Sequence, residues 1–155
     1  MRHPPVRSML FVLAAAVASP ALAADPKSPA PATQPAATPK LDVEAFDKAR
    51  QQPGAIVLDV RSPDEFADGH VPGAVNIPVA GKEGDKFDKA VAALPKDKPL
   101  LVHCRSGVRS AKAIAKLREM GFTNLSEFPG GWVAWAKAEK PAVKGAGGGE
   151  APKNP

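Results

Sequence analysis

One stretch of the chain places a thiol, two guanidinium groups and a glycine within seven residues. It reads Cys104-Arg105-Ser106-Gly107-Val108-Arg109-Ser110 and contains the only cysteine of the 155 residues. Before it, the apolar run from Leu100 to Val102 predicts a buried strand, and after it the periodic segment from Arg109 to Met120 predicts a helix. Cys104 therefore falls on a strand-to-helix turn, where α/β sheets hold their reactive groups.

The predicted turn has the features that favour an ionised thiol. Backbone N–H groups at a helix start have no intrahelical partner, and the helix dipole adds a positive end. Arg105 and Arg109 add two formal positive charges, which lower thiol pKa values, and Gly107 allows the positive φ of a tight anion-binding loop. We expect a reactive Cys104 thiolate that faces an anion. The alternative, a buried and inert cysteine, leaves the flanking charges without a role. His103 should point to the opposite face, as a packed or surface histidine rather than a general base.

The first 23 residues have the pattern of a secretory signal peptide. Arg2 and Arg7 give a positive start, Leu10 to Ala18 is apolar, and Ala21-Leu22-Ala23 offers a small-residue cleavage site. The apolar run is too short to span a bilayer. We expect cleavage near Ala23, a periplasmic or secreted protein, and no membrane span after processing.

Composition divides the remainder into three parts. Residues 24–40 contain five prolines and no large apolar side chain, so we expect a flexible linker. Residues 141–155 are rich in glycine, alanine and proline and predict a flexible tail. Residues 41–140 remain as one globular domain with enough apolar side chains to form a core.

Charge and cysteine content exclude several functions. Without the two arginines of residues 1–23, the 21 basic and 16 acidic residues leave a net charge of +3, and the absence of long Lys/Arg runs gives no sign of nucleic-acid binding. A single cysteine forms no internal disulfide, no two-cysteine redox motif and no cysteine-based zinc site. In an oxidising compartment, it is either a working nucleophile or a site of intermolecular pairing. We expect no metal and no cofactor.

Strands and helices alternate along the predicted domain. The expected elements are a helix capped by Asp42 and ended by Pro53-Gly54, a strand over 55–60, a short helix from Pro63 to Gly69 with a Ser62 and Glu65 capping box, a strand over 75–78, a helix over 86–94, the strand and helix that flank Cys104, a strand within 122–128 and a helix over 130–138. Such alternation predicts an α/β fold with a parallel sheet of four or five strands and helices on both faces.

Three segments together resemble the rhodanese (sulfurtransferase) domain family. They are Leu58-Asp59-Val60-Arg61-Ser62-Pro63-Asp64-Glu65-Phe66 with the following Gly69 to Pro78, then Cys104 to Ser110, then Pro129-Gly130-Gly131-Trp132-Val133-Ala134-Trp135. The resemblance implies a rhodanese-like sheet of about five parallel strands. It also implies transfer of a sulfane sulfur from thiosulfate or a related donor, through a persulfide on Cys104, to cyanide or a thiol, including a protein thiol. The expected protein is a monomer.

The resemblance also suggests roles for the other site residues. Backbone N–H groups of Arg105 to Ser110 are expected to stabilise the sulfur anion, and Arg105 and Arg109 to hold the donor or brace the loop. Asp59 and Arg61 are expected to support the loop, or else to form a solvated surface ion pair. Glu65 is expected to be a cap, while the glycines and tryptophans of the third segment are expected to be structural.

Loop length distinguishes this chain from cysteine phosphatases, which place an arginine six positions after the cysteine. Here the sixth position is Ser110, and Arg109 is the fifth. The shorter loop suits a transferable sulfur better than a phosphoryl group, although its N–H groups could hold an oxyanion. A binding or sensing module without turnover is the second alternative. Ser106 is an uncharged residue of the loop, so the identity of the preferred sulfur donor stays open.

Overall fold

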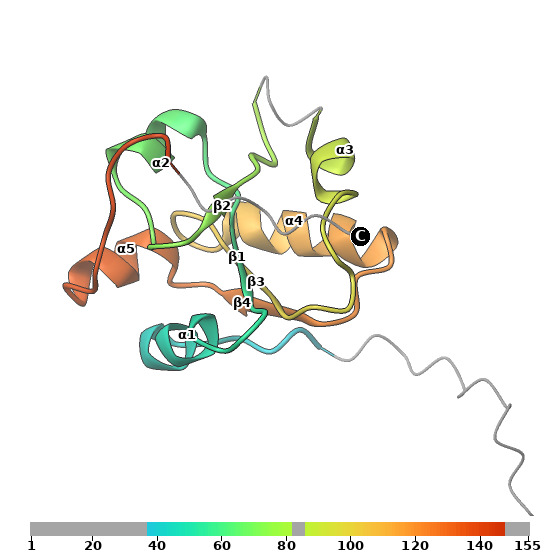
Figure 1. Cartoon of the computed structure of the whole chain (residues 1–155), viewed down its shortest axis with the longest axis horizontal. Helices are drawn as coiled ribbons and strands as arrows, with labels where there is room; N and C mark the ends of the chain where they lie inside the picture. The colour runs from blue at the N-terminus through green and yellow to red at the C-terminus, as the bar shows by residue number, and fades with distance from the viewer. Residues whose placement is uncertain (1–36, 82–85, 148–155) are drawn as a thin grey trace, which may run out of the picture. The chain divides into compact units, whose positions relative to one another are not determined.

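The structure is a computed structural model that describes residues 37–81 and 86–147. The predicted signal peptide, most of the predicted linker and the last eight residues lie outside this range. The described chain forms a sheet of four parallel strands in the order β2-β1-β3-β4 (Figure 1). These strands are β1 (Ile56–Asp59), β2 (Val75–Asn76), β3 (Leu100–His103) and β4 (Leu125–Phe128). The predicted parallel α/β architecture is therefore confirmed.

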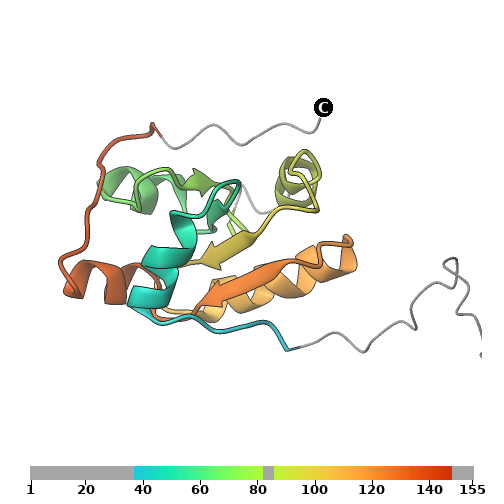
Figure 2. The same cartoon turned by 60° about the horizontal axis from the view of Figure 1, so that its bottom comes forward.

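Five helices in the described part of the chain cover the sheet on both faces (Figure 2). They are α1 (Val43–Arg50), α2 (Pro63–Asp68), α3 (Phe87–Val91), α4 (Val108–Glu119) and α5 (Gly131–Lys137). Phe46 of α1 and Trp135 of α5 pack with Val57 and Leu101 on one face of the sheet. The side chains of α3 and α4 pack on the other face, in a core that includes Cys104. Burial on both faces explains why β1 and β3 are continuous apolar runs.

The helix starts follow the predicted local chemistry. Asp42 caps α1 by accepting a hydrogen bond from the Ala45 N–H at 2.8 Å, and Ser62 and Glu65 form the predicted capping box of α2. Gly121, just after α4, has the positive φ expected of a residue that ends a helix. Some elements are shorter than expected: α3 covers only Phe87–Val91, and β2 covers only Val75–Asn76.

The predicted fifth strand is reduced to a single bridge in the part of the chain that the structure describes. Lys40 lies beside Glu127 in parallel orientation, with hydrogen bonds from the Leu41 N–H to the Glu127 carbonyl and from the Glu127 N–H to the Pro39 carbonyl. Pro39 has no N–H to extend the ladder, and α1 is capped at Asp42. The pairing therefore stops after one residue.

The segment after α5 differs from the expected flexible tail. Val143 exchanges two backbone hydrogen bonds with His70, of 2.8 and 2.9 Å, and the Gly145 N–H donates to Ala67 in α2. The indole N–H of Trp135 donates to the Pro141 carbonyl at 2.8 Å. Composition did not reveal this contact because backbone pairing does not require large side chains. Within the described ranges, no helix is both long and apolar enough to cross a membrane.

A chain that ends at Lys140 should be less stable than one that ends at Gly147. The shorter chain loses the pairing with His70 and leaves the Trp135 indole N–H without its partner, which should cost about 1–3 kcal/mol. Urea unfolding of both chains measures the difference. Equal stabilities would show that residues 141–147 contribute nothing to the fold.

Candidate active site

Cys104 lies directly after β3, with its side chain turned into the loop that leads to α4. Its residue is only 1% exposed, and the Gly107 N–H points at Sγ with a separation of 3.1 Å. Gly107 has a φ of 94°, and a Cβ at this position would lie 2.9 Å from the Pro129 carbonyl oxygen. The turn therefore needs a glycine, as predicted. Val108 begins α4 with its side chain 79% exposed.

Backbone groups rather than arginine charges dominate the environment of the thiol. Burial alone raises the pKa of Cys104, but hydrogen bonding by the N–H groups of Ser110, Ser106 and Gly107 brings it below its usual value. Neither guanidinium group is among the main causes of this shift. The expected lowering of the thiol pKa is therefore supported, but chiefly through local N–H dipoles.

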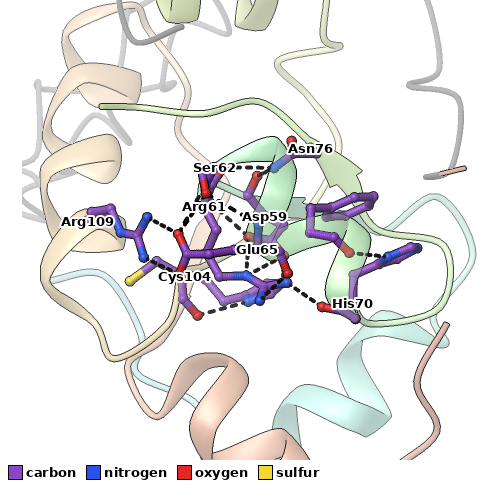
Figure 3. A network of polar contacts seen from close by, with 11 residues as sticks. Asp59, Arg61, Ser62, Glu65, His70, Asn76, Cys104 and Arg109 are labelled. Atoms are coloured by element: carbon purple, nitrogen blue, oxygen red, sulfur yellow. Dashed lines mark hydrogen bonds and ion pairs between the residues drawn. The ribbon is translucent and has the colours of Figure 1, made fainter. Parts of the chain in front are cut away.

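Arg109 braces the loop. Its guanidinium donates two hydrogen bonds to Glu65, from Nη1 to Oε2 at 2.6 Å and from Nη2 to Oε1 at 2.8 Å (Figure 3). This pairing is the main cause that lowers the pKa of Glu65 to about 2. Glu65 is therefore both the predicted cap and an anchor for the loop. The second role was not visible in the sequence because 44 residues separate the partners.

Arg105 has a different position. It is exposed, and none of the described residues forms a hydrogen bond or an ion pair with its guanidinium. Beside it, a surface groove is also lined by Arg61, Asp68, Trp132 and Val133. Of the two loop arginines, Arg105 is thus the one available to an approaching anion.

Asp59 and Arg61 form a buried ion pair, so the alternative of a solvated surface pair is wrong. Arg61 is 1% exposed and Asp59 0%, and Nη2 lies 2.6 Å from Oδ2. Arg61 also donates to the carbonyls of Glu65 and Gly69. His103 lies on the other side of the pair, with Nε2 3.7 Å from Asp59. It is completely buried, as the packed alternative predicted, and burial lowers its pKa.

The ion pair is connected to the Cys104 loop through Trp132. The Arg61 guanidinium lies 4.9 Å from the centre of the Trp132 ring, and the Trp132 N–H donates to the Cys104 carbonyl at 2.8 Å. Gly131 has a positive φ, and a Cβ there would collide with the same carbonyl. Trp135 is a core side chain, as expected. Gly131 and Trp132, which were predicted to be structural, thus contact the Cys104 loop directly.

Sequence reasoning missed Glu127. This carboxylate is only 6% exposed, and its Oε1 lies 2.9 Å from the Ser110 hydroxyl. That hydroxyl in turn lies 3.8 Å from Cys104 Sγ. The available signal was a charged residue within a predicted strand, directly before the apolar Phe128.

Comparisons with known proteins agree with this geometry. Residues 42–138 match the rhodanese-like domain. The chain belongs to the rhodanese-like domain family. It is 38% identical over 87 residues to "Thiosulfate sulfurtransferase 16, chloroplastic" of Arabidopsis thaliana, covering 52% of this chain and 72% of that protein. It is 33% identical over 88 residues to a "Sulfurtransferase" of Allochromatium vinosum, covering 57% and 78%.

Solved structures show the same domain. A single-domain sulfurtransferase of Saccharomyces cerevisiae aligns with a TM-score of 0.58 and 26% identity, over 70% of this chain and all of that one. A rhodanese-related protein of Thermoplasma volcanium aligns with a TM-score of 0.59 and 28% identity, over 68% and 97%. Some relatives are much longer: the matched region is 21% of a probable adenylyltransferase/sulfurtransferase of Mycobacterium tuberculosis. The chain is thus a member of the rhodanese-like family, and its relatives include proteins named as sulfurtransferases.

Replacing Glu65 by glutamine should destabilise the domain in a pH-dependent way. The pKa of Glu65 lies near 2 in the folded protein, below its usual 4.5, so the pair contributes fully above pH 4.5 and its contribution disappears as the pH falls through about 2. We expect a loss of about 1–2 kcal/mol at neutral pH, because the pair is partly exposed.

Urea unfolding of the parent and Glu65→Gln at several pH values tests this expectation. Asp64→Asn, which changes an exposed neighbour, is the control. A gap between the parent and Glu65→Gln that stays constant down to pH 2 would contradict the assignment of the lowered pKa to this pair.

Proposed function

We propose that this protein transfers sulfane sulfur through a persulfide on Cys104, with thiosulfate or a related small anion as donor and a thiol or cyanide as acceptor. The Cys104 thiolate attacks the outer sulfur of thiosulfate. The new S–S bond forms while the donor's own S–S bond breaks, and sulfite leaves with the bonding electron pair. An acceptor thiolate or cyanide then takes the terminal sulfur and regenerates the Cys104 thiolate.

The observation that carries this proposal is the set of backbone N–H groups in the loop that hydrogen-bond to the sulfur of Cys104. The pKa of the thiol is lowered, which provides the nucleophile, and the same N–H groups can stabilise a terminal persulfide anion. The sulfurtransferase names of the relatives give independent support. Export is part of the proposal and rests on the signal-like residues 1–23 alone.

The pairing of Arg109 with Glu65 argues against phosphatase chemistry. A phosphoryl group needs a free guanidinium in the loop, but both Nη atoms of Arg109 are bound to Glu65. Arg105 remains as the cation that can meet the sulfonate end of a donor. The second candidate, a module that binds an anion without turnover, shares the whole site and differs only in the outcome of the assay.

Changing Cys104 to serine should abolish sulfur transfer. The purified protein is incubated with thiosulfate and cyanide, and thiocyanate is measured. The intact mass after incubation with thiosulfate alone should show one added sulfur atom in the parent and none in Cys104→Ser. Thiosulfate binding without product or adduct would instead favour the non-catalytic module.

Changing Arg105 to glutamine should raise KM for thiosulfate more than it lowers kcat. Loss of one charge-assisted contact to an anion corresponds to roughly a tenfold change. Because Arg105 contributes little to the thiol pKa, the pH dependence of thiolate formation should stay as in the parent. Lys112→Gln, an exposed cation on α4, is the control, and an effect of equal size there would reduce the role of Arg105 to general charge.

A further inference from the structure

The Ser110 hydroxyl lies near three possible hydrogen-bond partners but has only one proton to donate. Its oxygen lies 2.8 Å from the Gly107 carbonyl oxygen and 2.9 Å from Glu127 Oε1, and Cys104 Sγ lies 3.8 Å away. A hydroxyl donates once and accepts through its lone pairs. The direction of this one O–H bond therefore decides what Ser110 presents to the nucleophile.

Two observations favour Glu127 as the acceptor. The Gly107 carbonyl already accepts from the Ala111 N–H at 3.0 Å, so it is satisfied without Ser110. The Glu127 carboxylate is 6% exposed, and among the described residues Ser110 is its one hydrogen-bond donor. A buried carboxylate without a donor is costly, and bonds to an ionised acceptor are the stronger ones.

We propose that Glu127 is a positioning residue for the nucleophile. Its carboxylate accepts the hydrogen bond that the Ser110 hydroxyl donates, so that the Ser110 oxygen turns its lone pairs toward Cys104. In this arrangement the thiol donates to Ser110, and Ser110 donates to Glu127. Ionised Glu127 therefore favours the protonated thiol and opposes the N–H groups of the loop. The inference takes Cys104 as the nucleophile, as the proposed function does, but it concerns only the thiol's proton.

The surroundings leave few other titratable groups to act on this chain of contacts. Apart from Ser110, the buried side chains of helix α4, which covers Glu127, are apolar, namely Ala113, Ile114 and Leu117. Lys40 meets Glu127 through a backbone bridge. Arg109 interacts electrostatically with Cys104, and its partner Glu65, with a pKa of about 2, stays ionised wherever the thiol titrates.

The test measures thiolate formation without any sulfur donor, so a failure of sulfur transfer leaves it interpretable. The ultraviolet absorbance of the thiolate is followed against pH in the whole protein, which has one cysteine and no tyrosine to interfere. Glu127→Gln should lower the pKa of Cys104 by about one unit, giving about tenfold more thiolate below both midpoints. Glu119→Gln, an exposed carboxylate on the same helix as Ser110, should leave the midpoint unchanged.

Ser110→Ala supplies an independent test by the sign of its effect. A hydroxyl that donated to Cys104 would stabilise the thiolate, and its removal would raise the thiol pKa. Under our proposal the pKa does not rise, and adding Glu127→Gln to Ser110→Ala produces less than half of the shift seen with Ser110 present. A higher pKa in Ser110→Ala, no shift in Glu127→Gln, or an undiminished shift in the double variant would each overturn the proposal. If Glu127→Gln does not fold, the sign in Ser110→Ala decides.

Discussion

The site depends on backbone N–H groups that converge on a sulfur atom removed from water. Burial by itself would keep Cys104 protonated, and the thiol pKa falls only because the Gly107, Ser106 and Ser110 N–H groups are fixed around it. These groups belong to the turn between β3 and α4, whose geometry requires the positive φ of Gly107. Reactivity is therefore a property of the backbone path more than of any side chain.

A turn of this kind keeps its shape only if its outward carbonyls are also held. The carbonyl of Cys104 accepts from Trp132, whose ring lies against Arg61, and Arg61 is fixed by the buried Asp59. Arg109 ties the start of α4 to Glu65 on α2. Breaking the buried Asp59–Arg61 pair would leave an uncompensated charge in the core. The loop is thus supported from β1, α2 and α5 at once.

The sequence predicted those parts of the site that lie close together along the chain. The cysteine, the glycine at the turn and the capping box of α2 follow from local rules that need no tertiary information. The pairing of Arg109 with Glu65 and the contact of Ser110 with Glu127 could not be derived in this way, because they join segments 44 and 17 residues apart. Local chemistry likewise did not show that Arg61 is buried, since an Asp–Arg pair after a strand has the same pattern on a surface.

A carboxylate acting on the nucleophile is consistent with the demands of a two-step transfer. A thiolate with a very low pKa leaves readily but attacks weakly, and the attacking power of a thiol is greatest when its pKa lies near the ambient pH. In the proposed mechanism, Cys104 attacks the donor in the first step and leaves from its persulfide in the second. The N–H groups alone favour leaving, while the proposed action of Glu127 through Ser110 would restore basicity for attack. Opposing effects on the pKa of one thiol therefore suit a cysteine that acts first as nucleophile and then as leaving group.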